Sequence, residues 1–235
     1  MSLVVDVVIP ARDEAESLPA VLAALPRSGD GWQLRRVCVV DNGSRDATAA
    51  VAVRAGAEVV SEPIAGYGLA CLAGIAALRA DPPDAVAFLD ADHSDDPGEL
   101  PRLLAPLVAG EAELVIGARV PGRREPGAFT PVQSFGNALA GALLRVFWGI
   151  AATDLGPFRV IRWQTLEALA MRDRDFGWTA EMQARAAHQR RAIREVPVSY
   201  RRRPRGRSKI AGTLTGSVRA GWKIVTTLIR VRLGG

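Results

Sequence analysis

Residues 85–97 read AVAFLDADHSDDP, and the interpretation of the whole chain starts from this stretch. It opens with a short apolar run that predicts a buried strand. Asp90 and Asp92 follow at once, and Asp95 and Asp96 complete four carboxylates within seven residues. Such crowding is unfavourable unless a cation is present, although an Asp-X-Asp pair alone also occurs in solvated turns. The stretch therefore predicts a strand that ends at a site for a hard divalent cation.

On both sides of this stretch, short apolar runs alternate with segments of helical spacing. This alternation is typical of an α/β fold in which helices cover both faces of a parallel sheet. Polar groups follow three of the expected strands, at 11–14, 41–46 and 90–96, and parallel strands bring such groups to one edge. Strands are expected at 3–9, 37–40, 58–60, 85–89, 113–116, 158–161 and 193–199, and helices at 14–25, 46–55, 67–78, 97–109, 133–151, 164–171, 179–190 and 217–233.

The composition is that of an ordinary folded domain of 235 residues, 49% hydrophobic, 23% charged and 6% aromatic. Cys38 and Cys71 lack Cys-X-X-Cys spacing, which argues against a disulfide scaffold or zinc site and favours a reducing compartment. We expect no signal peptide, and no apolar run reaches the ~18 residues that a membrane span needs. No linker divides the chain, so residues 1–215 are expected to form one domain.

The net charge of +5 hides an asymmetry along the chain. Residues 201–235 carry ten Lys and Arg and no acidic residue, whereas the first 200 residues carry 20 basic and 25 acidic side chains. A basic tail on an acidic body predicts an anionic partner, such as phosphates, a membrane surface or nucleic acid. A solvated tail without a partner is the alternative.

The end of the chain, residues 216–235, is predicted to be a basic amphipathic helix. Val218, Trp222 and Leu228 lie on its apolar face. A helix of this kind suits the surface of an anionic bilayer. Packing of the apolar face on the domain core or on a second subunit is the alternative.

Six motifs follow one another along residues 3–215. They are VVIPARDE at 7–14, VVDNGSRDAT at 39–48, FLDADHSDDP at 88–97, GAR at 117–119, DLGPFR at 154–159 and RPRGRSK at 203–209. Their order and spacing resemble those of glycosyltransferase family 2, the nucleotide-sugar transferases that have the GT-A fold. The last motif, RxxGxSK, is similar to that of polyprenyl-phosphate sugar transferases such as dolichol-phosphate mannose synthase. The resemblance implies an α/β catalytic domain with a mostly parallel central sheet flanked by helices.

The resemblance implies a nucleotide-sugar site at the strand ends. Pro10, Ala11 and Glu14 would hold the base and ribose, with Glu14 accepting a ribose hydroxyl. Asp41 resembles the aspartate that bonds the base. A helix N-cap role for Asp13 is an alternative use of this first strand end.

The resemblance also implies Mg²⁺ or Mn²⁺ as a cofactor. Asp90 would face the ribose or the metal, and Asp92 would bind the metal that stabilises the departing diphosphate, which makes Asp92 a catalytic residue. The family often has Gln where Ser94 stands, as a third ligand. Ser94, Asp95 or water is left to complete the shell.

Arginine and lysine side chains are expected to grip an acceptor phosphate, because arginine forms bidentate, charge-assisted bonds to it. Lysine is rare in this chain, which has only Lys209 and Lys223 against twenty-eight arginines. For Arg123 and Arg124, a solvated loop is the alternative. By resemblance, the acceptor-phosphate residues are Arg119, Arg123, Arg124, Arg203, Ser208 and Lys209, of which Arg119, Arg203 and Lys209 are also expected to be catalytic.

The acceptor decides whether a general base is needed. A phosphate monoester has a second pKa of ~6 and is largely a dianion at neutral pH, so it needs positioning rather than deprotonation. A hydroxyl acceptor requires a base, for which Asp154 and Glu181 are the candidates. Loop anchoring by Asp154 and a solvent-facing role for Glu181 are the structural alternatives.

The sequence thus predicts a metal-dependent, inverting hexosyltransferase that uses a UDP- or GDP-sugar and a polyprenyl phosphate. It is expected to be peripheral at the cytoplasmic face of the membrane, with homo-oligomerisation left open. A soluble hydroxyl acceptor is the alternative among enzymes. A nucleic-acid binder is disfavoured because no nucleic-acid module or interleaved aromatics accompany the basic tail. A nicotinamide oxidoreductase is disfavoured because no GxGxxG follows the first strand.

Overall fold

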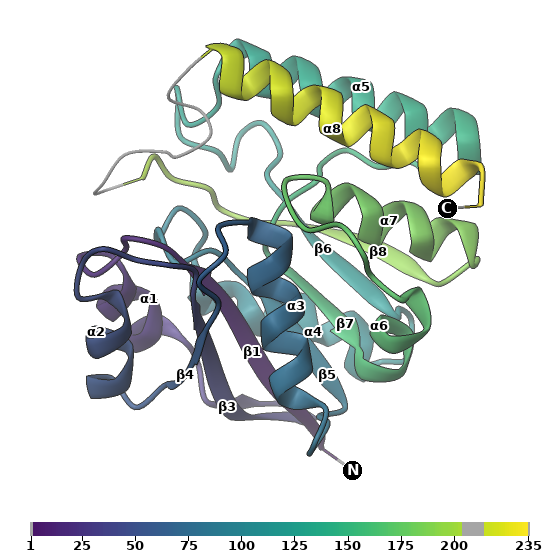
Figure 1. Ribbon diagram of the computed structural model, residues 1–235. Coiled ribbons are helices and arrows are strands. Elements are labelled where there is room, and N and C mark those ends of the chain that lie inside the picture. Colours follow the sequence, from purple (N-terminus) through teal and green to yellow (C-terminus); the bar gives the residue numbers. More distant parts are fainter. Residues whose placement is uncertain (1, 204–213, 235) are drawn as a thin grey trace.

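The computed structural model describes residues 2–203 and 214–234, and over these residues the fold is an eight-stranded sheet covered by helices (Figure 1). The strand order is β2-β3-β1-β5-β7-β6-β8, and β4 also pairs with β3. The strands are β1 (Leu3–Ala11), β2 (Ser28–Gly29), β3 (Trp32–Asp41), β4 (Glu58–Ser61), β5 (Ala85–Phe88), β6 (Leu114–Ala118), β7 (Arg159–Arg162) and β8 (Ile193–Pro197).

The predicted mostly parallel sheet is confirmed, with β7 as its main exception. β1 is parallel to β3 and β5, but β7 is antiparallel to β5 and to β6. Val160 and Ile161 of β7 are buried, and a short apolar run gives the same pattern in either direction. The short β2, antiparallel to β3, was not predicted, because both of its residues are exposed and form no apolar run.

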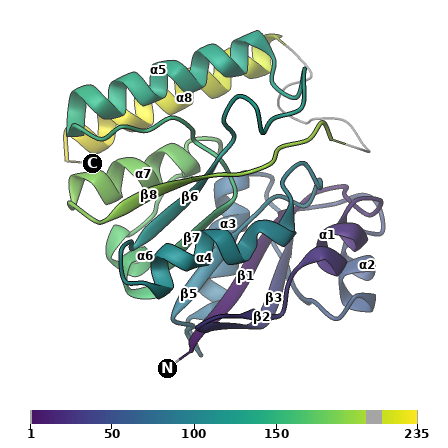
Figure 2. The same cartoon turned by 180° about the vertical axis from the view of Figure 1, so that it is seen from behind.

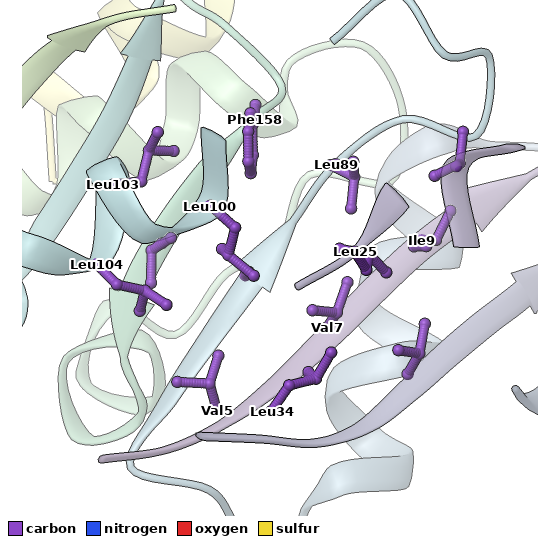
Figure 3. Close-up of a cluster of buried hydrophobic side chains, with 14 of the residues drawn as sticks. Val5, Val7, Ile9, Leu25, Leu34, Leu89, Leu100, Leu103, Leu104 and Phe158 are labelled. Carbon is purple, nitrogen blue, oxygen red and sulfur yellow. The ribbon is translucent and has the colours of Figure 1, made fainter. Parts of the chain in front are cut away.

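Helices cover both faces of the sheet, as expected (Figures 1 and 2). Alternate residues of β1 enter two cores: Val7 and Ile9 pack with α1 and α4, and Val8 packs with α3, α6 and α7. Figure 3 shows the first of these cores. The helices are α1 (Leu18–Ala24), α2 (Thr48–Arg54), α3 (Tyr67–Leu78), the 3₁₀ turn η1 (Pro97–Glu99), α4 (Leu100–Val108), α5 (Pro131–Trp148), α6 (Trp163–Leu169), α7 (Trp178–His188) and α8 (Leu214–Arg232).

The predicted C-terminal helix is α8, which lies side by side with α5 and packs on α5 and α7 (Figures 1 and 2). Leu228 and Val231 are buried in this packing, whereas Trp222 is 71% exposed and Ile229 is 42% exposed. The apolar face is therefore divided between the domain and the solvent, and Val218 has a side chain outside the described residues. None of the helices in the described ranges is long and apolar enough to cross a bilayer.

Candidate active site

A cavity of about 370 Å³ lies beyond the carboxyl ends of β1, β3 and β5, where the sequence placed the polar strand ends. Open α/β sheets bind their ligands at such crevices. The loop before α7 and the segment after β8 complete the walls. The lining residues are Pro10, Arg12, Glu14, Asn42, Ala65, Gly66, Tyr67, Asp90, Ala91, Asp92, Asp175, Phe176 and Arg203.

Asp90 brings to this cavity a carboxylate with one oxygen that has no hydrogen-bond partner among the described residues. Its Oδ1 is buried and has no hydrogen-bond partner within the part of the chain that the structure describes. Burial, and then the neighbouring Asp92, raise the pKa of Asp90 to about 7. The Tyr67 hydroxyl is buried beside it, and burial together with Asp90 raises the pKa of Tyr67. A buried acceptor that lacks a donor is costly, so this carboxylate marks a place where a ligand or ion can complete the bonding.

Arg203 crosses the cavity and joins its two acidic walls. Its guanidinium nitrogens lie 2.7 Å from Glu14 Oε1 and 2.8 Å from Asp92 Oδ2. Asp92 Oδ1 accepts the Ser94 N–H at 2.8 Å, and Glu14 Oε2 accepts the Ser17 hydroxyl at 2.7 Å. The Arg203 guanidinium therefore supplies a positive charge next to the crowded carboxylates.

The carboxylate pair suits a hard cation whose remaining ligands come from a phosphate group and water. Among the described residues, no three His, Cys, Asp or Glu side chains converge on one point. Mg²⁺ is commonly held by one or two carboxylates with substrate phosphates, and Mn²⁺ also prefers oxygen ligands. The orphaned Asp90 Oδ1 agrees with such a site. The predicted third ligands are less well placed, since Ser94 and Asp95 are buried outside the cavity lining.

The first strand end brings part of the predicted set to the cavity. Pro10 and Glu14 line it, whereas Ala11 is buried and does not. Asp13 is not the N-cap of α1, a position that Ser17 holds, so that alternative was wrong. The expected helix began too early because the Glu14 end of the segment forms a turn first.

The second strand end contributes Asn42 rather than the predicted Asp41. Asp41 does not line the cavity, and its Oδ1 accepts the Ser44 N–H at 3.2 Å, which is a turn contact. Asn42 lines the cavity, and its amide nitrogen donates to the carbonyls of Glu62 at 3.0 Å and Ile64 at 2.7 Å. The Asn42 side chain thus shapes the wall through the chain that leads to α3.

Arg119 and Asp154 form a buried ion pair outside the cavity lining. The Arg119 guanidinium donates to both Asp154 oxygens, at 2.7 and 2.8 Å, and the Arg119 backbone N–H donates at 2.8 Å. The guanidinium lies 4.6 and 4.9 Å from the ring centroids of Phe129 and Tyr200. Although burial opposes it, Arg119 holds the pKa of Asp154 below its usual value. We call Arg119, Asp154, Phe129 and Tyr200 the arginine cage.

Glu181 is also committed to the scaffold. Its carboxylate accepts the Arg185 Nε at 2.8 Å, the Asp173 N–H at 2.7 Å and the Arg172 N–H at 3.0 Å. The side chain is buried, so its predicted solvent-facing alternative was wrong. Both candidate bases therefore hold backbone and arginine groups, and neither lines the cavity.

The remaining predicted phosphate-binding residues lie towards the surface or outside the described residues. Arg123 is 3.3 Å from Glu99, and Arg124 lies 4.2 Å from the centre of an aromatic ring in its own loop. Ser208 and Lys209 fall outside the described residues.

Sequence reasoning missed Arg12, Tyr67, Asp175 and Phe176, which all line the cavity. One signal was present for Tyr67, because glycines stand on both sides of it. A Cβ on Gly68 would lie 2.1 Å from a carbonyl oxygen of the loop before α7, so the glycine permits that close approach. Asp175 and Phe176 carry no pattern of their own and reach the cavity only through the fold.

Comparison with known sequences gives a consistent result. The model of the family described as glycosyl transferase family 2 matches residues 6–170. An uncharacterized glycosyltransferase of Mycobacterium tuberculosis is 43% identical over 226 residues, which cover 94% of this chain and 98% of the relative. The undecaprenyl-phosphate mannosyltransferase of Micrococcus luteus is 34% identical over 221 residues, which cover 89% of this chain and 88% of the relative.

A solved structure extends the likeness to the whole fold. Glucosyl-3-phosphoglycerate synthase from Mycobacterium tuberculosis, in complex with Mn²⁺, UDP-glucose and phosphoglyceric acid, is similar with a TM-score of 0.76 and 25% identity. The match covers 99% of this chain and 80% of that protein. The GT-A architecture expected from the motifs is thereby confirmed.

Proposed function

The chain belongs to glycosyl transferase family 2 and is a glycosyltransferase, and we propose that it transfers a hexose from a UDP- or GDP-sugar to a polyprenyl phosphate, with inversion. The observation that carries this proposal is the state of its buried carboxylates. Those at the cavity leave an acceptor oxygen for a ligand, while the two that could activate a hydroxyl are bonded to the scaffold.

We propose the cavity as the donor site because two arginine side chains and the Asp90–Asp92 pair line it. Arg12 and Arg203 supply positive charge for a diphosphate, and Glu14 offers carboxylate oxygens to ribose hydroxyls. Pro10 completes that wall as the resemblance implied. The solved relative that binds UDP-glucose supports a nucleotide-sugar donor.

Asp90 and Asp92 would hold Mg²⁺ or Mn²⁺, which when bound neutralises charge on the departing nucleotide diphosphate. The relative that binds Mn²⁺ together with UDP-glucose supports this assignment. In the present structure the Arg203 guanidinium bonds Asp92, so donor binding would move Arg203 from the carboxylate to phosphate oxygens. Arg203 would then lie between the donor diphosphate and the acceptor phosphate, because its five N–H donors can serve both groups.

A phosphate acceptor agrees with the absence of an uncommitted base among the predicted candidates. Asp154 is paired with Arg119, and Glu181 is paired with Arg185, so both carboxylates are committed. An ionised phosphate does not need a carboxylate to act as a base. The relative from Micrococcus luteus is named for undecaprenyl phosphate, which supports a lipid phosphate here. We propose that Arg203, Ser208 and Lys209 meet the acceptor phosphate, and that Arg119 supports them from within the arginine cage.

Peripheral contact with the cytoplasmic face of an anionic membrane is part of this proposal. The basic side chains Arg145 of α5 and Arg232 of α8 are exposed on the paired helices. Basic amphipathic surfaces bind anionic lipids through both apolar burial and charge. Among the side chains of the two helices that the structure describes, the large exposed apolar ones are Val132, Phe135, Leu139, Val146, Trp222 and Ile229, and exposed Leu233 follows α8.

A soluble phosphorylated acceptor is the second candidate function. The specific observation in its favour is the solved relative with phosphoglyceric acid, which this chain matches over 99% of its length. Transfer to a hydroxyl of such an acceptor would need a base, and that requirement separates the two candidates.

The test is transfer of radiolabelled sugar from UDP-glucose and from GDP-mannose, with Mn²⁺ or Mg²⁺. The acceptors are a short-chain polyprenyl phosphate and 3-phosphoglycerate, offered separately. The proposal expects label in the lipid phosphate, and Asp154→Asn protein that remains folded should retain that activity. Transfer to 3-phosphoglycerate alone would overturn the lipid acceptor in favour of the second candidate.

A further inference from the structure

Asp173 links the C-terminal helix to a wall of the cavity. Its side chain is 1% exposed, and its two oxygens face different elements. Oδ1 accepts the N–H groups of Asp175 at 2.9 Å and Gly177 at 3.1 Å. Oδ2 lies 3.1 Å from Lys223 Nζ and accepts the Thr227 hydroxyl at 3.3 Å. One carboxylate thus shapes the loop 173–177 and receives its charge partner from α8.

The same loop presents Asp175 and Phe176 to the cavity. From the other side, Arg174 accepts the Leu69 N–H of α3 through its carbonyl at 3.1 Å. The wall is therefore held by both α3 and α8, and its cavity-facing residues directly follow these two attachments.

Gly177 allows α8 to come this close. A Cβ at this position would lie 2.4 Å from Asp173 Oδ2 and 2.5 Å from the Thr227 hydroxyl oxygen. Real Cβ atoms do not approach polar atoms so closely, so the glycine makes room for the contact between loop and helix.

We propose that Lys223 and Thr227 are positioning residues for the donor site, acting through Asp173 on the loop that carries Asp175 and Phe176. This inference rests on the proposed function for the identity of the ligand. It makes α8 a working part of the donor site as well as a surface helix. It also gives a role to Lys223, one of only two lysines in the chain.

The physical reason is the burial of the Asp173 carboxylate. Removing Lys223 leaves that charge without its cation, and a buried charge that loses its partner rearranges its surroundings. The Asp173 carboxylate then shifts towards other donors, and its Oδ1 hydrogen bonds to the Asp175 and Gly177 amides weaken. The loop loses its fixed shape, and with it the order of the donor-facing side chains.

The test compares Lys223→Met with Arg230→Met, which removes the same charge from an exposed position on the same helix. It also compares Thr227→Val with Thr226→Val, because the Thr226 hydroxyl bonds carbonyls of its own helix, those of Trp222 and Lys223, at 3.0 Å. Lys223→Arg is the rescue variant. The probes are UDP-glucose and GDP-mannose with Mn²⁺, titrated by calorimetry into the full chain.

We expect the donor Kd to rise roughly tenfold in Lys223→Met and roughly threefold in Thr227→Val. The controls should match the parent, and Lys223→Arg should recover most of the affinity. In turnover assays the donor KM should rise while the acceptor KM stays constant. Hydrogen exchange over residues 173–177 should quicken in Lys223→Met and not in Arg230→Met.

Unchanged donor Kd and unchanged exchange in Lys223→Met would overturn the inference, even if its melting temperature fell. If the parent binds neither sugar nucleotide, the proposed function fails. Exchange over residues 173–177 would in that case still decide whether α8 shapes the loop, because that measurement needs no ligand.

Discussion

The cavity carboxylates and the arginine cage hold buried charge in opposite ways. At the cavity, Asp90 Oδ1 is buried without a partner in the described chain, and Asp92 is paired with an arginine that reaches it from beyond β8. In the cage, Asp154 receives three bonds from Arg119, whose guanidinium also lies 4.6 and 4.9 Å from the centres of two aromatic rings. A buried acid that lines a cavity and is incompletely paired indicates a ligand site, and a fully paired one away from the cavity indicates scaffold.

The comparison shows which of two similar motif aspartates lies at the candidate site. Asp92 and Asp154 are both aspartates in motifs of the family, and the sequence offered both as functional. Only the first lines the cavity. We therefore expect substitution of a cavity carboxylate to reduce sugar transfer, and substitution in the arginine cage to reduce the free energy of unfolding.

Asp154→Asn should give the largest effect, a loss of about 3–5 kcal/mol in the free energy of unfolding, because it leaves Arg119 buried without its carboxylate. Urea unfolding measures this. Arg123→Met is the control, since it removes an exposed ion pair worth under about 1 kcal/mol. A stable Asp154→Asn protein that had lost donor binding would reverse the roles of the two regions.

Asp92→Asn should lower sugar transfer by roughly 100-fold or more while the fold survives, because it removes one anionic oxygen without changing volume. The Asn side chain can still accept the Ser94 N–H. Asp96→Asn, in the same turn but outside the cavity lining, is the matched control. Full turnover in Asp92→Asn would remove the cavity carboxylates from the reaction.

Acid should weaken the cage in a defined direction. Arg119 lowers the pKa of Asp154 below its unfolded value of about 3.9, so the stability that this group contributes is present above that pH and is lost as pH falls through the folded pKa. The difference in unfolding free energy between parent and Asp154→Asn should narrow below about pH 4. A difference that stayed constant down to the acid transition would contradict this assignment.

The smallest effect is expected at the surface of α5 and α8. Phe135→Ser and Trp222→Ser change side chains that are 70% and 71% exposed, so each should leave the free energy of unfolding within about 0.5 kcal/mol. Each should weaken binding to vesicles containing anionic lipid by roughly threefold or more. Val53→Ser, at a 61% exposed position on α2, is the control. If Phe135→Ser and Trp222→Ser bound these vesicles as tightly as Val53→Ser and the parent, membrane contact would be removed from the proposal.

Local sequence patterns predicted most of the fold. The apolar run before Asp90 and the helical spacing over 67–78 gave a strand and a helix close to those observed, because burial on a sheet and on one helix face imposes distinct periods. The direction of β7 was beyond this reasoning, because its three consecutive buried residues give the same pattern in either chain direction. The C-terminal helix was predicted, but some of its apolar residues pack on the domain and others face solvent. The helical period does not tell which residues do which.

The site was predictable where residues follow a strand directly. Glu14, Asp90 and Asp92 reach the cavity for that reason. Phe176 comes from a loop that contacts α3 and α8, which are distant in the sequence, so no local signal marks it. The commitment of Asp154 to Arg119 joins residues 35 positions apart, and only the folded chain brings them together.

The most direct test of the central claim is calorimetric titration of UDP-glucose and GDP-mannose into the parent and Asp90→Asn proteins, each with Mn²⁺ and with excess EDTA. If the orphaned carboxylate at the end of β5 holds the donor through a cation, one of the two sugar nucleotides binds the parent only with Mn²⁺, and Asp90→Asn loses most of that affinity. Equal affinity in EDTA, or in Asp90→Asn, would contradict the account.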